Sequence, residues 1–368
     1  MILTKFLTIL CVVLFGMLGT FLFFSRKKRS RSNRILALFF WLWGLNFLDG
    51  FLLLDGFYLE YPSLALWEDP LVFLYGPVIY FYYRSLTALT PFWKPLYVLH
   101  LAPVVLLQLV AILFFHSQPV SYKRDIINHI LNLEQPPEIF ILTLVIFTHI
   151  IGYIITSGLL IQRYTNKMKN NYSTLNLSWM KNVLRSLAYL VALSLLVSIL
   201  QYFGEPLYFE IGLLVLMASI SVFISNVLFR ALEEPQMFVF QDSCDKYRGS
   251  NLSGPEVEVI ADKIKNAIEQ DMLYLDPNTT ISDLADAVGI TARQVSQVIN
   301  QSFRQNFFEL INSYRIMEAQ KIIKHSADPK MTILEIMYKA GFNSKSSFNT
   351  QFRKFTGITP SEFKRLHN

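Results

Sequence analysis

The stretch TTISDLADAVGITARQVSQVI, residues 279–299, has the spacing of two short helices joined by a tight turn. Thr280, followed three residues later by Asp283, is a capping box, a pattern that starts a helix. Gly289 then tolerates the left-handed backbone of a sharp turn. Thr291 with Gln294 caps the next helix in the same way. This stretch therefore predicts a helix-turn-helix.

The same pattern recurs further along the chain. Thr332 and Glu335 form a second capping box, Gly341 turns the chain, and Ser344 caps a further helix. A long amphipathic helix is predicted between the two motifs, at about 307–325. A single match is weak evidence because helical hairpins are common. Two matches in tandem, joined by one helix, indicate a domain with two helix-turn-helix units.

Charge is distributed unevenly over the second half of the chain. The net charge is +6. Residues 287–368 hold twelve Lys and Arg but five Asp and Glu, whereas residues 231–286 are acidic. A basic segment of this kind suits a surface that meets a polyanion such as double-stranded DNA. An ordinary solvated surface is the alternative interpretation.

Residues 1–230 have the composition of a membrane domain. The whole chain is 53% hydrophobic and only 16% charged, against about 25% charged residues in soluble domains. A helix needs about 20 apolar residues to cross a bilayer. The third predicted span is the weakest, because Arg84 lies near its end, and it could begin near Leu64. The seven predicted spans are 3–24, 35–54, 71–89, 95–115, 139–161, 182–203 and 207–229.

Loop charges predict the orientation of these spans. Cations dominate the first, third and fifth loops, whereas the second and sixth loops are acidic and the fourth is mixed. By the positive-inside rule, the cation-rich loops are cytoplasmic and the N-terminus lies outside. The C-terminal domain then lies in the cytoplasm, beneath the bacterial cytoplasmic membrane. Low cysteine usage, at Cys11 and Cys244, fits a reducing compartment.

Three polar residues within the predicted spans form a candidate signal site. Asn46 and Asp49 lie in the second span and His149 lies in the fifth. Ionisable groups in hydrocarbon are costly and usually face a cavity or the bundle interior. They predict either a pocket for a small-molecule or membrane signal, or hydrogen bonds that only hold the helices together.

Residues 231–255 are polar, contain Pro and Gly, and predict a flexible cytoplasmic linker. A flexible chain of this length spans roughly 28 Å on average. Residues 256–368 would then form the soluble domain, with helix-turn-helix units at about 280–299 and 332–355. The fold class predicted is all-α: a seven-helix transmembrane bundle followed by this soluble domain.

The soluble part resembles a known family. The run GFNSKSSFNTQFRKFTGITPSEFKR, 341–365, is similar to the C-terminal signature of AraC/XylS-type regulators. The segment 307–323 resembles their linker helix, with Arg315 and Ala319 at its typical Arg and Ala positions. The resemblance covers about 256–368, under a third of the chain. The arrangement also resembles the members that carry a multi-span membrane region.

The resemblance implies that each second helix of a motif enters a major groove, with the two contacts about 34 Å apart. Arg suits guanine, and Asn or Gln suits adenine. Phosphates would be held by further polar and basic residues and by helix N-termini. The implied base readers are Arg293, Gln294, Gln297, Lys345, Ser346, Asn349 and Thr350, and the implied phosphate contacts are Thr291, Arg304, Ser344, Arg353 and Lys354.

Two departures from the family pattern affect packing. The turn 301–306 lacks the usual Gly, so Arg304 or Asn306 must take the left-handed conformation. Met337 stands where the family usually has Ala. Neither departure touches the predicted base-reading surface, so both concern how the helices pack.

The function predicted is a membrane-bound, sequence-specific DNA-binding transcription regulator that couples a signal at the membrane to promoter binding through its tandem helix-turn-helix units. The sequence contains no Walker-type loop, HExxH or GxSxG motif, so we expect no enzyme, catalytic residue, cofactor or metal. RNA polymerase and a second copy of the chain are further candidate partners. The alternative is a membrane transporter or enzyme with a regulatory domain that resembles a DNA-binding one.

Overall fold

The computed structural model describes residues 2–24, 31–87, 94–132, 137–174, 177–233, 254–326 and 330–367 of the 368-residue chain. The chain divides into unit 1, Met1–Ile161 with Trp179–Asp242, and unit 2, Gln162–Ser178 with Ser243–Asn368. Within the described ranges, regular structure is helical apart from one isolated bridge between Tyr172 and Thr280, which confirms the all-α class. Most of the predicted linker 231–255 lies outside the described residues.

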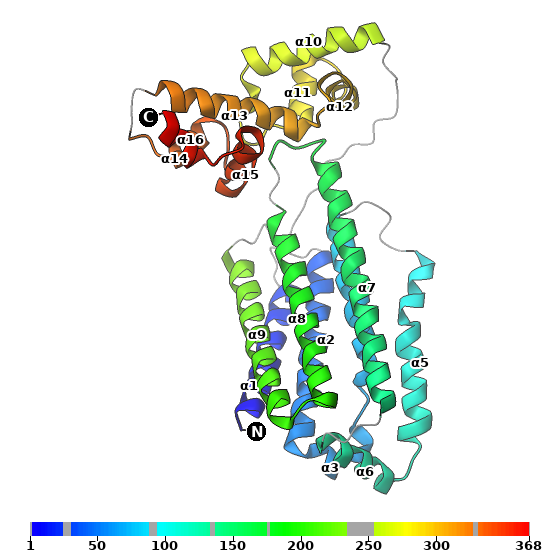
Figure 1. Ribbon diagram of the computed structural model, residues 1–368. Coiled ribbons are helices and arrows are strands. Elements are labelled where there is room, and N and C mark those ends of the chain that lie inside the picture. Colours follow the sequence, from blue (N-terminus) through cyan, green and yellow to red (C-terminus); the bar gives the residue numbers. More distant parts are fainter. Residues whose placement is uncertain are drawn as a thin grey trace. The chain divides into compact units, whose positions relative to one another are not determined.

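Unit 1 is a bundle of long apolar helices (Figure 1). Six helical stretches of the described residues are long and apolar enough to cross a membrane: Leu3–Phe24, Arg31–Asp55, Pro95–His116, Glu138–Met168, Trp179–Phe203 and Pro206–Val227. The helices are α1 (Ile2–Phe24), α2 (Arg31–Asp55), α3 (Phe57–Glu60), η2 (Pro62–Leu64), η3 (Asp69–Leu74), α4 (Tyr75–Thr87), η4 (Pro95–Leu101), α5 (Ala102–Ala111), η5 (Ile112–His116), α6 (Val120–Leu131), α7 (Pro137–Met168), α8 (Ser178–Phe203) and α9 (Pro206–Glu233).

The third predicted span, 71–89, is not among these six stretches. Its residues 71–87 belong to the six-residue 3-10 helix η3 and to the 13-residue helix α4 that follows directly, and 88–89 lie outside the described residues. Pro77 has no N–H to donate to the carbonyl oxygen of Phe73, which accounts for the break between the two elements. The other six predicted spans each correspond to one long helical stretch.

Aromatic packing holds α1 against α2. The ring of Phe15 lies 5.6 Å, centroid to centroid, from the ring of Phe47. A Cβ added to Gly44 would lie 3.3 Å from the Cβ of Phe15, so the small residue allows the two helices to approach closely. Helix α9 joins α1 through the Thr8 hydroxyl, which donates to the sulfur of Met217 at 3.8 Å.

Short helices close one end of unit 1. Helices α3 and α6 lie at the end of the unit where the N-terminus lies (Figure 1). They pack around a small core that includes Tyr58, Phe115 and Ile127. The Arg124 guanidinium on α6 donates to the carbonyl oxygen of Leu59 at 3.1 Å. This cap joins elements that follow the second and the fourth predicted spans.

In unit 2, shorter helices lie around the long helix α13 (Figure 1), and they form two small cores with it. Helix α13 gives Leu310 and Ile311 to the first core, and Ile316, Ala319 and Ile323 to the second. The helices of unit 2 are α10 (Gly254–Gln270), η7 (Leu273–Leu275), α11 (Ile281–Val288), α12 (Ala292–Val298), η8 (Ile299–Phe303), α13 (Phe307–His325), α14 (Ile333–Lys339), α15 (Lys345–Thr356) and α16 (Pro360–His367).

The predicted caps and turns are present in unit 2. Thr280, Thr291 and Thr332 each form a capping box with the third helical residue, and Ser344 accepts a hydrogen bond from the backbone of Ser347. In the two turns, Gly289 has φ 76° and Gly341 has φ 83°. The left-handed residue of the turn 301–306 is Arg304, with φ 51°, one of the two candidates. The departure at Met337 is accommodated by burial in the second core.

Candidate nucleic-acid interface and a cleft in unit 1

Helix α12 exposes part of its predicted reading face. Arg293 is exposed and Gln297 is half-buried. The Gln294 side-chain oxygen accepts hydrogen bonds from the Thr291 backbone N–H at 3.0 Å and from the Thr291 hydroxyl at 2.8 Å. Gln294 and Thr291 therefore serve the helix cap, a role that sequence analysis had assigned to them alongside DNA contact. Arg293 is the most accessible of the three candidate readers on α12.

Helix α15 exposes all four of its predicted readers. Lys345, Ser346, Asn349 and Thr350 are exposed, whereas Phe348 is fully buried on the opposite face. Residues four apart lie on one side of a helix. Lys345 and Asn349 therefore form one row, and Ser346 and Thr350 form an adjacent row. The Thr350 hydroxyl donates to the backbone oxygen of Ser346 at 2.8 Å, which fixes its rotamer.

An open polar groove continues the face of α15 toward α16. Its volume is about 730 Å³. The backbone N–H groups at the start of a helix favour anions such as phosphate, and the first residues of α16 line this groove. Glu362 already accepts from the Thr359 N–H at 2.8 Å. The lining residues are Asn349, Thr350, Arg353, Lys354, Thr359, Pro360 and Ser361.

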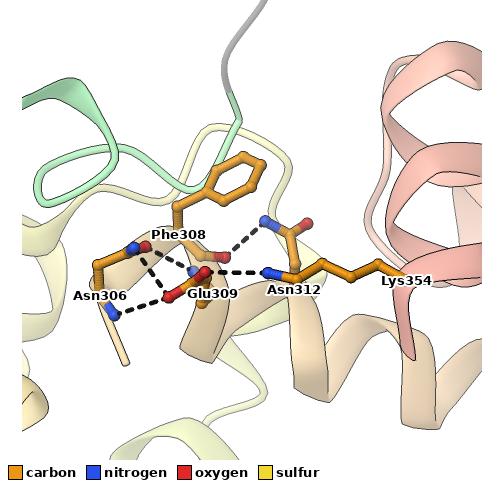
Figure 2. A network of polar contacts seen from close by, with 5 residues as sticks. All are labelled: Asn306, Phe308, Glu309, Asn312 and Lys354. Atoms are coloured by element: carbon orange, nitrogen blue, oxygen red, sulfur yellow. Dashed lines mark hydrogen bonds and ion pairs between the residues drawn. The ribbon is translucent and has the colours of Figure 1, made fainter. Parts of the chain in front are cut away.

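Lys354 is tied to the start of the linker helix (Figure 2). Its ammonium lies 2.9 Å from Glu309 Oε1. Glu309 Oε2 also accepts from the side-chain nitrogen of Asn306 at 2.9 Å, within the capping box of α13. Partial burial raises the pKa of Glu309, but the hydrogen bonds from Lys354 and Asn306 outweigh it and lower the pKa overall. Lys354 thus braces α15 against α13, in addition to its predicted phosphate contact.

Arg315, at the typical Arg position of the linker helix, is completely buried. Burial lowers its pKa to about 10, so it is charged at neutral pH. Its guanidinium donates to the backbone oxygens of Tyr274 at 2.6 Å and Asp276 at 2.7 Å. It also donates to Ser173 and Thr174, which belong to the segment after α7. Sequence analysis had treated that segment only as a basic loop.

Unit 1 contains a cleft that two of the three predicted signal-site residues line. The cleft has a volume of about 1020 Å³. Asn46, Asp49 and Asp69 form part of its polar wall. His149 is not among its lining residues; its ring packs instead against those of Phe73 and Tyr153, at 5.1 and 4.9 Å between centroids. The apolar wall includes Leu53, Leu107, Val110, Phe114, Ile139, Leu142 and Ile146.

Three carboxylates meet beside this cleft. The nearest oxygens of Asp49, Glu68 and Asp69 lie within 4.8 Å of one another. Tyr58 donates to Asp49 at 2.5 Å, and the Asn46 amide donates to Glu68 at 3.1 Å. Burial raises the pKa of Glu68 to about 7. Carboxylates at this spacing are able to share a cation, but two of them already accept hydrogen bonds from their neighbours.

Glu68, Asp69 and Tyr58 were not predicted from the sequence to be members of this cluster. The two carboxylates served there only as loop charges that fixed the orientation of the spans. Their spacing along the chain carries no signal, because the fold of the loop after α2 brings them together. The acidic bias of that loop was the one available indication.

Comparison with known proteins finds relatives of the C-terminal part of the chain. Residues 284–366 match the family model described as "Helix-turn-helix domain". An HTH-type transcriptional regulator from the cgkA 5′ region of Pseudoalteromonas carrageenovora is 31% identical over 28% of this chain and 62% of its own length. The melibiose operon regulatory protein of Escherichia coli K12 is 28% identical over 25% of this chain and 29% of its own length.

The C-terminal part of the chain is therefore an AraC-type helix-turn-helix domain. The chain spans less than two thirds of the length of these curated relatives. Among solved structures, it is similar to the C-terminal domain of the two-component response regulator yesN from Fusobacterium nucleatum. That similarity has 24% identity and a TM-score of 0.25, and covers 28% of this chain and 95% of that one.

Proposed function

We propose that this protein is a membrane-bound, sequence-specific transcription regulator that binds promoters through its two helix-turn-helix units. The observation that carries the proposal is the exposed face of α15, where Lys345, Ser346, Asn349 and Thr350 lie clear of the core. Arg293 is similarly exposed on α12, in the first helix-turn-helix unit. Such side chains at the N-terminal part of a second helix are positioned to reach base edges in a major groove.

Genome-wide mapping of the DNA that is cross-linked to the tagged full-length chain tests this proposal. We expect enrichment at a limited set of promoters that share a bipartite motif, with half-sites about one helical turn apart. Cross-linking spread evenly over the genome, in proportion to accessible DNA, would instead indicate sequence-independent binding. The promoters recovered would also indicate what the regulator responds to.

We further propose seven spans, with η3 and α4 together forming the third. Six residues of 3-10 helix and thirteen of α-helix rise together by about 30 Å, which matches the hydrocarbon thickness of a bilayer. An odd number of spans puts the N-terminus and the DNA-binding domain on opposite sides of the membrane, with the N-terminus outside and the DNA-binding domain in the cytoplasm in our proposal. The basic first, third and fifth loops support this orientation through the positive-inside rule.

Labelling of intact cells with a membrane-impermeant thiol reagent tests the seven-span topology. In a background of Cys11→Ser and Cys244→Ser, we expect Asn132→Cys to be labelled from outside and Lys94→Cys to be protected. An epitope tag before Met1 should be reached by antibody without permeabilising the cells. With six spans, the N-terminal tag would be enclosed together with the DNA-binding domain, which would contradict this topology.

The cleft beside Asp49 is our candidate site for the signal. Its long apolar wall and its carboxylate cluster fit a ligand with a hydrocarbon body and a positively charged group. Binding there would favour one arrangement of the bundle over another. A transporter or enzyme with a regulatory domain, the alternative above, would need ionisable groups along a continuous path.

Thermal unfolding of the detergent-solubilised chain tests the ligand class. We expect dodecylamine to raise the melting temperature and dodecyl alcohol, which lacks the charge, to have a smaller effect. Asp49→Asn should reduce the difference between the two, because it removes one of the carboxylates with little change in shape. If dodecyl alcohol stabilises the chain as well as dodecylamine does, the carboxylates do not select a cation.

A further inference from the structure

The segment Lys169–Thr174, which directly follows α7, is built into unit 2. The backbone N–H of Ile281 donates to the carbonyl oxygen of Asn171 at 2.9 Å, and that of Ser173 donates to Thr279 at 3.3 Å. These bonds flank the antiparallel bridge between Tyr172 and Thr280. The segment therefore lies along the chain at the start of α11, the first helix of the first helix-turn-helix unit.

The same segment also contacts the linker helix α13. The backbone N–H of Phe308 donates to the carbonyl oxygen of Lys169 at 2.9 Å. The Asn312 amide donates to the carbonyl oxygens of Ser173 at 2.9 Å and of Phe308 at 2.7 Å, the second of which is drawn in Figure 2. Asn312 is fully buried, so these bonds replace water that the side chain lost on folding.

Arg315 binds this segment most extensively. Its guanidinium donates to the Ser173 carbonyl oxygen at 3.3 Å, the Ser173 hydroxyl at 3.1 Å and the Thr174 hydroxyl at 3.2 Å. A fully buried guanidinium is strongly destabilising unless its donors are satisfied. Without residues 169–174, Arg315 would keep the backbone oxygens of Tyr274 and Asp276 but lose these three contacts.

This docking position lies at the joint between the two helix-turn-helix units. Arg315 sits on α13 between the residues that enter the first core and those that enter the second. The backbone oxygen of Tyr274, which accepts from Arg315, also lies close to the second helix-turn-helix unit. A Cβ added to Gly341, in the turn of that unit, would lie 2.5 Å from this oxygen. One backbone carbonyl therefore contacts both the guanidinium that holds the segment and the turn of the second motif.

We propose that the surface formed by Thr279–Ile281, Phe308, Asn312 and Arg315 is a docking site for Lys169–Thr174, through which the membrane half acts on DNA binding. When docked, the segment holds the joint between the two helix-turn-helix units in one arrangement. In that arrangement both recognition helices, α12 and α15, lie on DNA. Because Lys169 follows α7 without a break, a displacement of the end of α7 pulls on the docked segment and loosens the joint. This inference rests on the proposed function.

A disulfide across the bridge tests the proposal in the full-length chain, embedded in lipid nanodiscs. Tyr172 and Thr280 are a non-hydrogen-bonded antiparallel pair, whose Cα atoms lie about 4.5 Å apart, within the range of disulfides. Tyr172→Cys/Thr280→Cys is made in a background of Cys11→Ser and Cys244→Ser. Each single cysteine variant controls for the loss of the native side chain.

Ser173→Ala is added to weaken docking without touching the DNA-binding helices. It removes the hydroxyl that donates to Thr279 and accepts from Arg315. With its disulfide reduced, the variant that carries Tyr172→Cys, Thr280→Cys and Ser173→Ala should bind more weakly than the native sequence does. We expect about tenfold lower affinity for an operator recovered by genome-wide mapping. Oxidation should restore the affinity to within about threefold, because the cross-link replaces the lost contact. Ser186→Ala on α8 is the matched control and should leave affinity unchanged.

Three results are distinguishable. If the disulfide does not form, the segment does not dock as described and the proposal is overturned. If it forms but oxidation fails to restore the affinity that Ser173→Ala removes, docking does not control the joint, and the proposal is again overturned. If the native chain shows no sequence preference in the same assay, it is the proposed function that fails.

Discussion

At the scale of single residues, left-handed turn positions set the geometry of unit 2. Gly289 and Gly341 occupy equivalent turns of the two motifs, with φ 76° and 83°. A Cβ at Gly289 would meet no atom within 4 Å, whereas one at Gly341 would lie 2.5 Å from the Tyr274 oxygen. The two glycines therefore have the same backbone requirement but different surroundings.

This difference predicts unequal effects of the same substitution. Gly289→Ala should destabilise the DNA-binding domain by roughly 1 kcal/mol, from left-handed strain alone. Gly341→Ala should destabilise it by about 3 kcal/mol or more, because backbone must also move. Chemical denaturation of the two variants measures both values. Equal losses would show that the second turn does not pack closely against residues 274–275.

Arg293 is predicted to contact a base edge in the DNA. Arg293→Ala should weaken binding by about 1–3 kcal/mol at sites with the preferred base, and by much less when that base is changed. Binding to a panel of operators with single base changes measures this. An equal loss on every operator would mean that Arg293 contacts phosphate and reads no base.

At the scale of elements, capping boxes define where the helices of unit 2 begin. Glu335 shows their electrostatic contribution: hydrogen bonds from the Thr332 backbone N–H and hydroxyl lower its pKa below 4.5. A carboxylate whose pKa is lower in the folded state stabilises the fold above the unfolded-state pKa. That contribution disappears as the pH falls through the folded-state pKa.

Thermal unfolding as a function of pH should therefore show an acid-sensitive contribution from this cap. The melting temperature of the DNA-binding domain should fall as the pH drops below about 4.5. Glu335→Gln keeps the capping hydrogen bonds but has no charge to lose, so its melting temperature should depend less on pH. An unchanged pH dependence in this variant would exclude Glu335 as a contributor.

Sequence patterns predicted the elements of unit 2 well because caps and turns are local. Thr280 with Asp283 and Thr332 with Glu335 need only their own neighbours, and each capping box is present. The third predicted span is divided into η3 and α4, because average hydropathy does not register a proline such as Pro77. The carboxylate cluster at Asp49 and the docking of Ser173 depend on contacts between distant parts of the chain, which no local pattern reveals.

At the scale of the whole molecule, the DNA-binding domain is not a contiguous stretch of sequence. Its helices come from residues 254–367, but Arg315 and Asn312 take part of their hydrogen bonds from residues 173–174. A fragment that begins near residue 250 therefore lacks acceptors for buried donors. Such a fragment is an incomplete reference for what unit 1 contributes.

A comparison of a fragment with two fusions tests this point. Residues 250–368 should melt several degrees below the same fragment fused to residues 167–178 through a Gly-Ser linker, because the fusion restores acceptors to Arg315. A fusion carrying Ser173→Ala should melt between the two. Identical melting of all three would show that the segment adds nothing to the stability of the domain.

The central claim, that two helix-turn-helix units on one linker helix read one face of DNA, is tested most directly by half-site spacing. The full-length chain in nanodiscs would be titrated with operators whose half-sites are moved apart by about five base pairs, which is half a helical turn. We predict that this insertion weakens binding at least about tenfold, because α13 holds both helix-turn-helix units on one face of the duplex. Equal affinity for the original and the lengthened operators would contradict the account.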